Sequence, residues 1–238
     1  MTSVIRPEFN QRDIRSFVIR GGRITEAQQK AFDLYWPQYG LSLQNGAINP
    51  QQLFGNNNPL VVEIGYGMGD SLLTMAERET DKNFIGIEVH LPGVGRLVNE
   101  AGKRNLPNLK TYCADAIDVL TLCIAENSVS RLKLFFPDPW HKKRHHKRRI
   151  VQAEFIELVT SRLMTEGVFH LCTDWQPYAE YMLLMLNQVN ALSNQSPTAD
   201  YCARPDYRPI TKFERRGEKL GHGVWDLLFT KQMKSPAV

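Results

Sequence analysis

Three glycines alternate with larger residues in the stretch E-I-G-Y-G-M-G, which runs from Glu63 to Gly69. Glycine permits sharp turns and carries no Cβ, so Gly65, Gly67 and Gly69 would let a ligand lie directly against the main chain. Glu63, just before the turn, would repel a pyrophosphate but can accept a hydrogen bond from a cationic or hydroxylated ligand. The spacing differs from both the dinucleotide fingerprint and the P-loop, so it predicts another kind of cofactor site.

Two further acids follow segments that have the composition of strands. Glu88 lies 25 residues after Glu63, and a carboxylate there can accept two hydrogen bonds from the diol of a ribose. Asp115 comes directly after the next such segment, 109–113. A glycine turn alone is equally consistent with a purely structural turn. The two acids in addition favour a cofactor site.

A fourth acid stands between two prolines, in the sequence F-F-P-D-P-W. Pro137 and Pro139 restrict the backbone around Asp138. Parallel sheets bind their ligands at the carboxyl ends of the strands, and Asp138 follows the strand-like segment 131–136. A carboxylate held there, beside an aromatic ring such as that of Trp140, suits a flat and electron-rich substrate.

The next residues, 141–149, read H-K-K-R-H-H-K-R-R and are called the basic segment below. The segment contains six Lys and Arg and no acid; without these six, the chain has 23 basic and 25 acidic side chains, a net charge of −2 instead of +4. Such a concentrated excess predicts an anionic partner at one place, and the alternative is a solvated loop and helix start. The three histidines have no acid or cysteine beside them, so we predict no metal site.

Alternating strand and helix patterns position these residues. Apolar runs predict seven strands, at 60–64, 84–89, 109–113, 131–136, 167–172, near Tyr201 and at 223–230. Helical patterns are predicted from Thr25, whose side chain forms a capping box with Gln28, and at 71–79, 94–104, 116–124, 149–163 and 177–189. Residues 41–58 are rich in Asn, Gln, Gly and Pro and predict a loop. The alternation predicts an α/β fold with a mostly parallel sheet and helices on both faces.

The length of 238 residues, with 42% hydrophobic residues, fits one sizeable domain, which we predict over 25–238 after a flexible, arginine-rich arm at 1–24. No apolar run approaches the roughly 18 residues that a membrane span needs, and residues 1–11 do not resemble a secretory signal. The cysteines show neither C-x-x-C nor zinc-ligand spacing, which favours reduced thiols in a cytoplasmic protein; they are Cys113, Cys123, Cys172 and Cys202.

The acid followed by G-x-G-x-G after a strand resembles the first motif of class I S-adenosylmethionine-dependent methyltransferases, a Rossmann-like fold with a mostly parallel seven-stranded sheet. Three other stretches are similar to the bacterial tRNA (guanine-N7)-methyltransferases. The most specific is P-D-P-W-H-K-K-R-H-H-K-R-R at 137–149, where members of the family often have proline in place of His141. The others are G-R-I-T-E-A-Q at 22–28 and T-K-F-E at 211–214. The resemblance extends from about residue 20 to residue 230.

This resemblance implies that the cofactor is S-adenosylmethionine and that the substrate is tRNA, methylated at N7 of the guanine at position 46 in the variable loop. The implied cofactor-binding residues are Glu63, Gly65, Gly67, Gly69, Glu88, Asp115 near the adenine amine, and Asp138, which is also the implied catalytic acid. The implied substrate contacts are Lys142, Asp174, Thr211, Lys212, Phe213 and Glu214. The RNA backbone would contact Lys142, Lys143, Arg144, His145, His146, Lys147, Arg148 and Arg149. We further expect a cytoplasmic monomer with no membrane association and no obligatory protein partner.

The implied chemistry is consistent with these residue types. Guanine N7 has a free lone pair and no proton, so its attack on a sulfonium methyl group needs no general base. Catalysis then consists of in-line positioning and stabilisation of the developing positive charge, and Asp138 can orient the base through its N1 and N2 hydrogens.

Two alternatives remain open. The first is a methyltransferase for another nucleobase or for an exocyclic amine. The enzymes for exocyclic amines carry Asn/Asp-Pro-Pro-Tyr/Phe after the fourth strand, where this chain has the order Pro-Asp-Pro-Trp. The second is a non-enzymatic RNA-binding protein on a methyltransferase-like scaffold. The intact glycine turn and the presence of Glu63 and Glu88 count against it.

Overall fold

The computed structural model describes residues 6–10, 14–18, 25–210, 214 and 223–233. The chain divides into two compact units, which we call the N-terminal unit (Met1–Asp13 and Val18–Ala125) and the C-terminal unit (Ile14–Phe17 and Glu126–Val238). The predicted arm at 1–24 is therefore shared between them. Within the described ranges, no helix is both long enough and apolar enough to cross a membrane.

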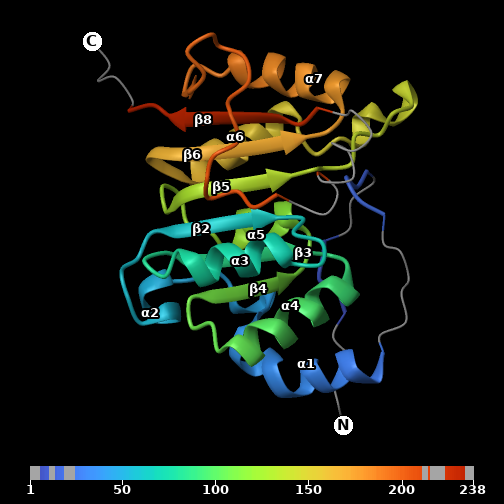
Figure 1. Cartoon of the computed structure of the whole chain (residues 1–238), viewed down its shortest axis with the longest axis vertical. Coiled ribbons are helices and arrows are strands. Elements are labelled where there is room, and N and C mark those ends of the chain that lie inside the picture. Colours follow the sequence, from blue (N-terminus) through green and yellow to red (C-terminus); the bar gives the residue numbers. More distant parts are fainter. Residues whose placement is uncertain (1–5, 11–13, 19–24, 211–213, 215–222, 234–238) are drawn as a thin grey trace. The chain divides into compact units, whose positions relative to one another are not determined.

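The N-terminal unit is built on four parallel strands in the order β1-β4-β3-β2 (Figure 1). Their bounds are β1 Gly40–Leu41, β2 Leu60–Ile64, β3 Asn83–Glu88 and β4 Leu109–Cys113. Every residue of β2 and β3 is buried, which explains why these strands have near-continuous apolar runs and no alternation. Parallel pairing places the carboxyl ends of β2, β3 and β4 at one edge of the sheet.

Helices cover the strands of this unit, with α3 and α4 on one face and α5 behind the strands on the other (Figure 1). The helices are α1 Glu26–Tyr39, η1 Leu43–Asn45, α2 Pro50–Phe54, α3 Asp70–Arg78, α4 Leu91–Arg104 and α5 Ala116–Leu122. The predicted capping box is confirmed, because Thr25 Oγ1 accepts from the Gln28 backbone N–H and the Gln28 side chain accepts from that of Thr25. The predicted loop at 41–58 contains η1 and α2, two short elements that its composition did not reveal.

The C-terminal unit has four strands in the order β5-β6-β8-β7 (Figure 1). The pair β5 and β6 is parallel, whereas β8 runs antiparallel to both β6 and β7. Their bounds are β5 Val129–Phe135, β6 Leu163–Thr173, β7 Leu192–Asn194 and β8 Trp225–Lys231. The predicted strand near Tyr201 is wrong: only a single bridge joins Cys202 to Asp226, and β7 lies earlier in the chain.

The helical elements of this unit are η2 Lys143–Arg148, α6 Ala153–Arg162 and α7 Gln176–Asn187. The predicted helix at 149–163 begins only at Ala153, because Arg149 ends the 3₁₀ turn η2 with a non-helical backbone and residues 150–152 are not helical. Both α6 and α7 pack on β6. The prediction of an α/β fold with mostly parallel strands is confirmed, but the described residues form eight strands where seven were expected, since β1 was not foreseen.

Candidate active site

The glycine turn leaves β2 with three left-handed glycines. The φ angles are +71° at Gly65, +58° at Gly67 and +81° at Gly69, a region that residues with side chains adopt only at a cost. A Cβ on Gly65 or Gly67 would meet nothing within 4 Å, whereas one on Gly69 would lie 2.6 Å from Leu97 Cδ1. The first two glycines therefore expose bare main chain, and the third allows α4 to pack closely.

Tyr66 points from the turn into the protein. Its hydroxyl lies 2.8 Å from Thr111 Oγ1 on β4, and its ring packs over Gly86, where a Cβ would come within 2.6 Å of the ring. Burial raises the pKa of the Tyr66 phenol well above its usual value, so it stays neutral. Tyr66 thus supports the turn from beneath.

Glu88 ends β3 and reaches the glycine turn, as its predicted role requires. Its Oε2 accepts a hydrogen bond from the Gly67 N–H at 2.8 Å, and its Oε1 accepts from the N–H groups of Val89 and His90 at 2.7 and 2.8 Å. Two carboxylate oxygens offer about four acceptor positions, and these three donors leave capacity for a ligand hydroxyl. The three backbone donors hold the carboxylate in a fixed orientation.

Glu63 and Asp115 lie at the same edge of the sheet as Glu88. Glu63 pairs in register with Gly86, Glu88 pairs with Cys113, and Asp115 follows β4. Both carboxylates are buried, and Asp115 Oδ1 caps α5 by accepting from the Ile117 N–H at 3.0 Å. The structure therefore brings together the glycine turn and the three predicted acids of the N-terminal unit.

Residues of the arm also reach this edge, which the sequence did not indicate. The Glu8 N–H donates to Cys113 O at 2.8 Å, and the Asp115 N–H donates to Glu8 O at 2.9 Å, so Glu8 extends the sheet by one bridge beside β4. The Glu8 carboxylate accepts from Ser42 Oγ and from the Leu43 N–H. The described part of the arm here is bonded to the sheet, whereas a flexible arm was expected.

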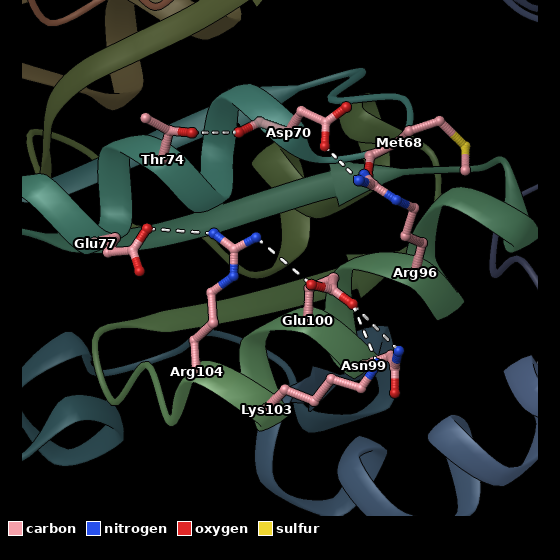
Figure 2. Close-up of polar contacts among 9 residues, drawn as sticks. All are labelled: Met68, Asp70, Thr74, Glu77, Arg96, Asn99, Glu100, Lys103 and Arg104. Carbon is pink, nitrogen blue, oxygen red and sulfur yellow. Dashed lines mark hydrogen bonds and ion pairs between the residues drawn. The ribbon is translucent and has the colours of Figure 1, made fainter.

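Arg96 of α4 is a second supporting residue that sequence patterns did not identify (Figure 2). Its guanidinium donates to the carbonyl of Met68 within the turn and to the carboxylate of Asp70, the first residue of α3. About two turns further along α4, Arg104 pairs with Glu77 of α3 at 3.2 Å. Figure 2 shows the side chains of both arginines extending from α4 to α3. Helix α4 therefore fixes the C-terminal end of the glycine turn, where α3 begins.

In the C-terminal unit, Asp138 and Asp174 follow the parallel strands β5 and β6 and therefore share an edge. The two loops are joined at their start, where the Phe136 N–H donates to Cys172 O at 2.8 Å. The rings of His141 and Trp175 then meet edge to face at 4.4 Å. Both carboxylates are exposed, so this edge presents two acids to a ligand.

The basic segment divides into an outer and an inner set. The side chains of the outer set are exposed; they are His141, Lys142, Lys143, Arg144 and Lys147. Arg149 is only 5% exposed: its Nε donates to Pro139 O at 2.9 Å and its guanidinium lies over the ring of Tyr178 at 4.7 Å. Burial lowers the Arg149 pKa, although guanidinium remains charged in proteins. This internal position differs from the predicted contact with RNA.

Arg148 also turns inward and binds the arm. Its Nε donates to Arg15 O at 3.1 Å and its Nη2 donates to Phe17 O at 3.2 Å, while its guanidinium stacks on Trp140 at 4.2 Å. The indole Nε1 of Trp140 donates to Ser16 O at 3.3 Å. The aromatic residue beside the Pro-Asp-Pro motif thus anchors the segment 15–17 together with Arg148.

The T-K-F-E element is described at one position only. Thr211, Lys212 and Phe213 lie outside the described residues. Glu214 is 4% exposed and both of its carboxylate oxygens accept from the guanidinium of Arg208, each at 2.7 Å. The structure therefore places the Glu214 carboxylate in an internal ion pair.

The glycine turn and its acids fit the methyl donor that the sequence predicted. Bare main chain at Gly65 and Gly67 admits a ligand at close range, and Glu88 retains acceptor capacity for a ribose diol. Chains with similar folds include the 16S rRNA methyltransferase KamB, with a TM-score of 0.58 and 13% identity over 77% of this chain and 92% of that one. A variant of a 16S rRNA (adenine(1408)-N(1))-methyltransferase from Catenulisporales acidiphilia, solved with S-adenosylmethionine, has a TM-score of 0.54 and 11% identity over 83% and 95%.

This fold and this turn define an S-adenosylmethionine-dependent methyltransferase, and a family model described as "Putative methyltransferase" matches residues 57–227. The tRNA (guanine-N(7)-)-methyltransferase of Saccharophagus degradans is 57% identical over 96% of this chain and 100% of its own. That of Marinobacter nauticus is 52% identical over 96% of both chains. The chain belongs to the tRNA (guanine-N(7)-)-methyltransferase family.

Proposed function

We propose that this protein transfers the methyl group of S-adenosylmethionine to N7 of the guanine at position 46 in the variable loop of tRNA. The observation that carries the proposal is the joint presence of an acid-lined glycine turn and a Pro-Asp-Pro-Trp motif followed directly by exposed cations. Near-full-length identity above 50% to several tRNA (guanine-N(7)-)-methyltransferases supports the choice of substrate and atom.

The N-terminal unit would hold the methyl donor. Gly65 and Gly67 provide bare main chain for its methionine part, Glu88 accepts from the ribose hydroxyls, and Asp115 lies at the adenine end. Glu63 adds a buried carboxylate at the end of β2, which can accept a hydrogen bond from a cationic ligand. When bound, the donor supplies an electrophilic methyl group, which the N7 lone pair accepts without loss of a proton.

Asp138 would act on the guanine. Its exposed carboxylate can accept hydrogen bonds from N1–H and N2–H and so fix the plane of the base. The purine becomes cationic as N7 gains the methyl group, and a nearby carboxylate stabilises that charge. Asp174, at the end of the neighbouring strand, lies on the same edge and is the second acid we assign to substrate binding.

The outer set of the basic segment would bind the RNA backbone. Lys142, Lys143, Arg144 and Lys147 are exposed cations that can neutralise phosphates without reading sequence. We do not assign backbone contacts to Arg148 and Arg149, whose guanidinium groups bind carbonyls of the protein itself. We further infer a cytoplasmic monomer that needs no protein partner, acting through residues 25–238 with the arm at 1–24.

The decisive experiment is a methyl-transfer assay with identification of the product nucleoside. Purified protein is incubated with radiolabelled-methyl S-adenosylmethionine and an unmodified tRNA transcript, alongside a transcript that carries adenine at position 46. We expect label in 7-methylguanosine for the first transcript and none for the second. Label in another nucleoside would redirect the proposal to another base, and cofactor binding without any methyl transfer to tRNA would refute it.

A further inference from the structure

Trp175 presents an indole ring to solvent at the edge of the sheet where Asp138 and Asp174 lie. All four tryptophans of the chain fall within the described residues, and Trp175, with 39% of its surface exposed, is the only one of them that is exposed. The other three are partly buried; they are Trp36, Trp140 and Trp225. Ligands bind at the carboxyl ends of parallel strands, so a large aromatic surface left in water there calls for a ligand that covers it.

The main chain of Trp175 is fixed although its ring is exposed. Trp175 directly precedes α7, and its carbonyl oxygen accepts from the N–H groups of Tyr178 and Ala179 at 2.9 and 3.0 Å. Its own N–H donates to Oγ1 of Thr173, the buried last residue of β6, at 3.2 Å. The ring therefore projects from a fixed point at the carboxyl end of β6, which reduces the entropy that is lost when a ligand covers it.

A second ring orients the indole. The imidazole of His141 meets it edge to face, with ring centroids 4.4 Å apart and an interplanar angle of 79°, a geometry that aromatic pairs favour. His141 follows the Pro-Asp-Pro-Trp motif, so this contact joins the ring of Trp175 to the loop that carries Asp138. An edge-to-face contact covers at most one face of the indole. The exposed surface of Trp175 is therefore open to a flat ligand.

The charges around Trp175 favour a nucleobase over a phosphate at this place. Asp138 and Asp174 are exposed acids that follow the parallel strands β5 and β6. Carboxylates repel phosphate but accept hydrogen bonds from the N–H groups of a base, and guanine carries such donors at N1 and N2. Exposed cations that suit phosphates begin at Lys142, the residue after His141. A base on Trp175 with its backbone on the basic segment would satisfy both sets of charges.

We propose that Trp175 is the platform on which the target guanine stacks, with the N1 and N2 edge of the base toward the two acids. The proposal rests on the function proposed above and adds a substrate-binding residue to it. As N7 bonds the methyl carbon, the sulfur keeps the electron pair of the broken bond and positive charge passes to the purine. The π electrons of an indole attract cations, so Trp175 binds the charged product more strongly than guanine and stabilises the charge that develops during transfer.

Two substitutions separate stacking from apolar coverage. Trp175→Phe keeps an aromatic face, whereas Trp175→Leu keeps an apolar side chain without one. We expect kcat/KM for tRNA to fall roughly tenfold or more in Trp175→Leu and to stay within about threefold of wild type in Trp175→Phe. The matched control is Leu184→Ala, which removes a 59% exposed apolar side chain of α7 and should stay within about twofold. Equal losses in the Phe and Leu variants, or a loss below about threefold in Trp175→Leu, would overturn the proposal.

A binding cycle tests the contact without any methyl transfer. With S-adenosylhomocysteine present, the Kd of wild type and of Trp175→Leu is measured for a tRNA transcript and for the same transcript with an abasic site at position 46. If Trp175 stacks on that base, its removal raises the Kd by a factor about fivefold larger in wild type than in Trp175→Leu, because effects of groups in contact are not additive.

The cycle also distinguishes the stacking platform from the proposed function. Equal factors in the two proteins would refute stacking, even where the wild-type protein forms 7-methylguanosine. Unequal factors in a wild-type protein that transfers no methyl group to tRNA would retain the stacking platform and refute the proposed function.

Discussion

At the scale of single residues, Asp138 is the side chain on which turnover should depend most. Asp138→Asn keeps the shape but removes the charge that orients the guanine and stabilises its cationic product. We expect kcat to fall roughly a hundredfold, as for other groups that stabilise transition-state charge, with a much smaller change in the Kd for S-adenosylhomocysteine. Asp81→Asn, an exposed acid of the N-terminal unit, is the control and should retain full activity. Near-normal turnover of Asp138→Asn in a single-turnover assay would contradict the assignment.

A substitution of Gly67 tests whether the cofactor lies against the glycine turn, and Gly55 offers a matched control. Both residues have left-handed φ angles, +58° and +72°, and a Cβ on either would meet nothing within 4 Å. Alanine should therefore cost each variant about 1–2 kcal/mol of unfolding free energy from backbone strain alone. Only Gly67→Ala should also weaken S-adenosylhomocysteine binding, by at least tenfold in calorimetric titration, because its methyl group would occupy the face assigned to the cofactor. Equal affinities in the two variants would place the cofactor elsewhere.

At the scale of elements, the basic segment predicts two different phenotypes for neighbouring cations. Lys147→Gln should make the plot of log Kd for tRNA against log salt concentration shallower by about one unit, since one phosphate contact is lost. Arg149→Gln should leave that slope unchanged and lower the unfolding free energy by about 2 kcal/mol, because the buried charged hydrogen bond to Pro139 is lost. Salt titrations and urea unfolding of both variants check the distinction. The reverse assignment of the two effects would contradict it.

The sequence predicted the elements whose signals are local. Short segments rich in apolar and β-branched residues located β2 and β4 to the residue, and the Thr25 capping box located the start of α1. What it missed depends on contacts between distant parts of the chain. The basic segment forms a 3₁₀ turn because Arg149 binds Pro139 O and packs on α7, and the helix expected there begins only at Ala153.

In the candidate site, too, the residues with a local sequence signal were predicted and those that depend on contacts between distant parts of the chain were not. Glu88 and Asp115 could be assigned because they follow strands that are adjacent in a parallel sheet, a regularity that spacing reveals. The contacts of Glu8 with β4 and of Arg208 with Glu214 and Asp226 have no such spacing signal. Nor does sequence separate exposed Lys147 from buried Arg149, because both carry the same charge in one run.

At the scale of the whole molecule, a cluster of buried charges in the C-terminal unit makes stability depend on pH through His170. Its Nε2 faces Asp226, its Nδ1 faces Tyr207, and the cations Arg208 and Lys133 act on it electrostatically. Burial is the largest effect and lowers the pKa of His170; the hydrogen bond and negative charge of Asp226 raise it, and the repulsion of Arg208 and Lys133 lowers it further, so that the net pKa is lowered. The folded chain therefore keeps this histidine neutral at a pH where an exposed histidine takes up a proton.

Acid lowers the stability of the protein because the unfolded chain binds a proton at His170 more readily than the folded chain does. As the pH falls below about 6.5, the ordinary histidine value, the unfolded chain binds a proton at His170 before the folded chain does. The unfolding free energy should therefore decrease toward acid, with a contribution from this group of at most about 1.4 kcal/mol per pH unit, and recover as the pH rises above that value. Urea unfolding between pH 5 and pH 8 measures the slope. His170→Gln should be less stable at neutral pH and show a flatter acid limb, whereas an acid limb as steep as that of wild type would assign the loss to other groups.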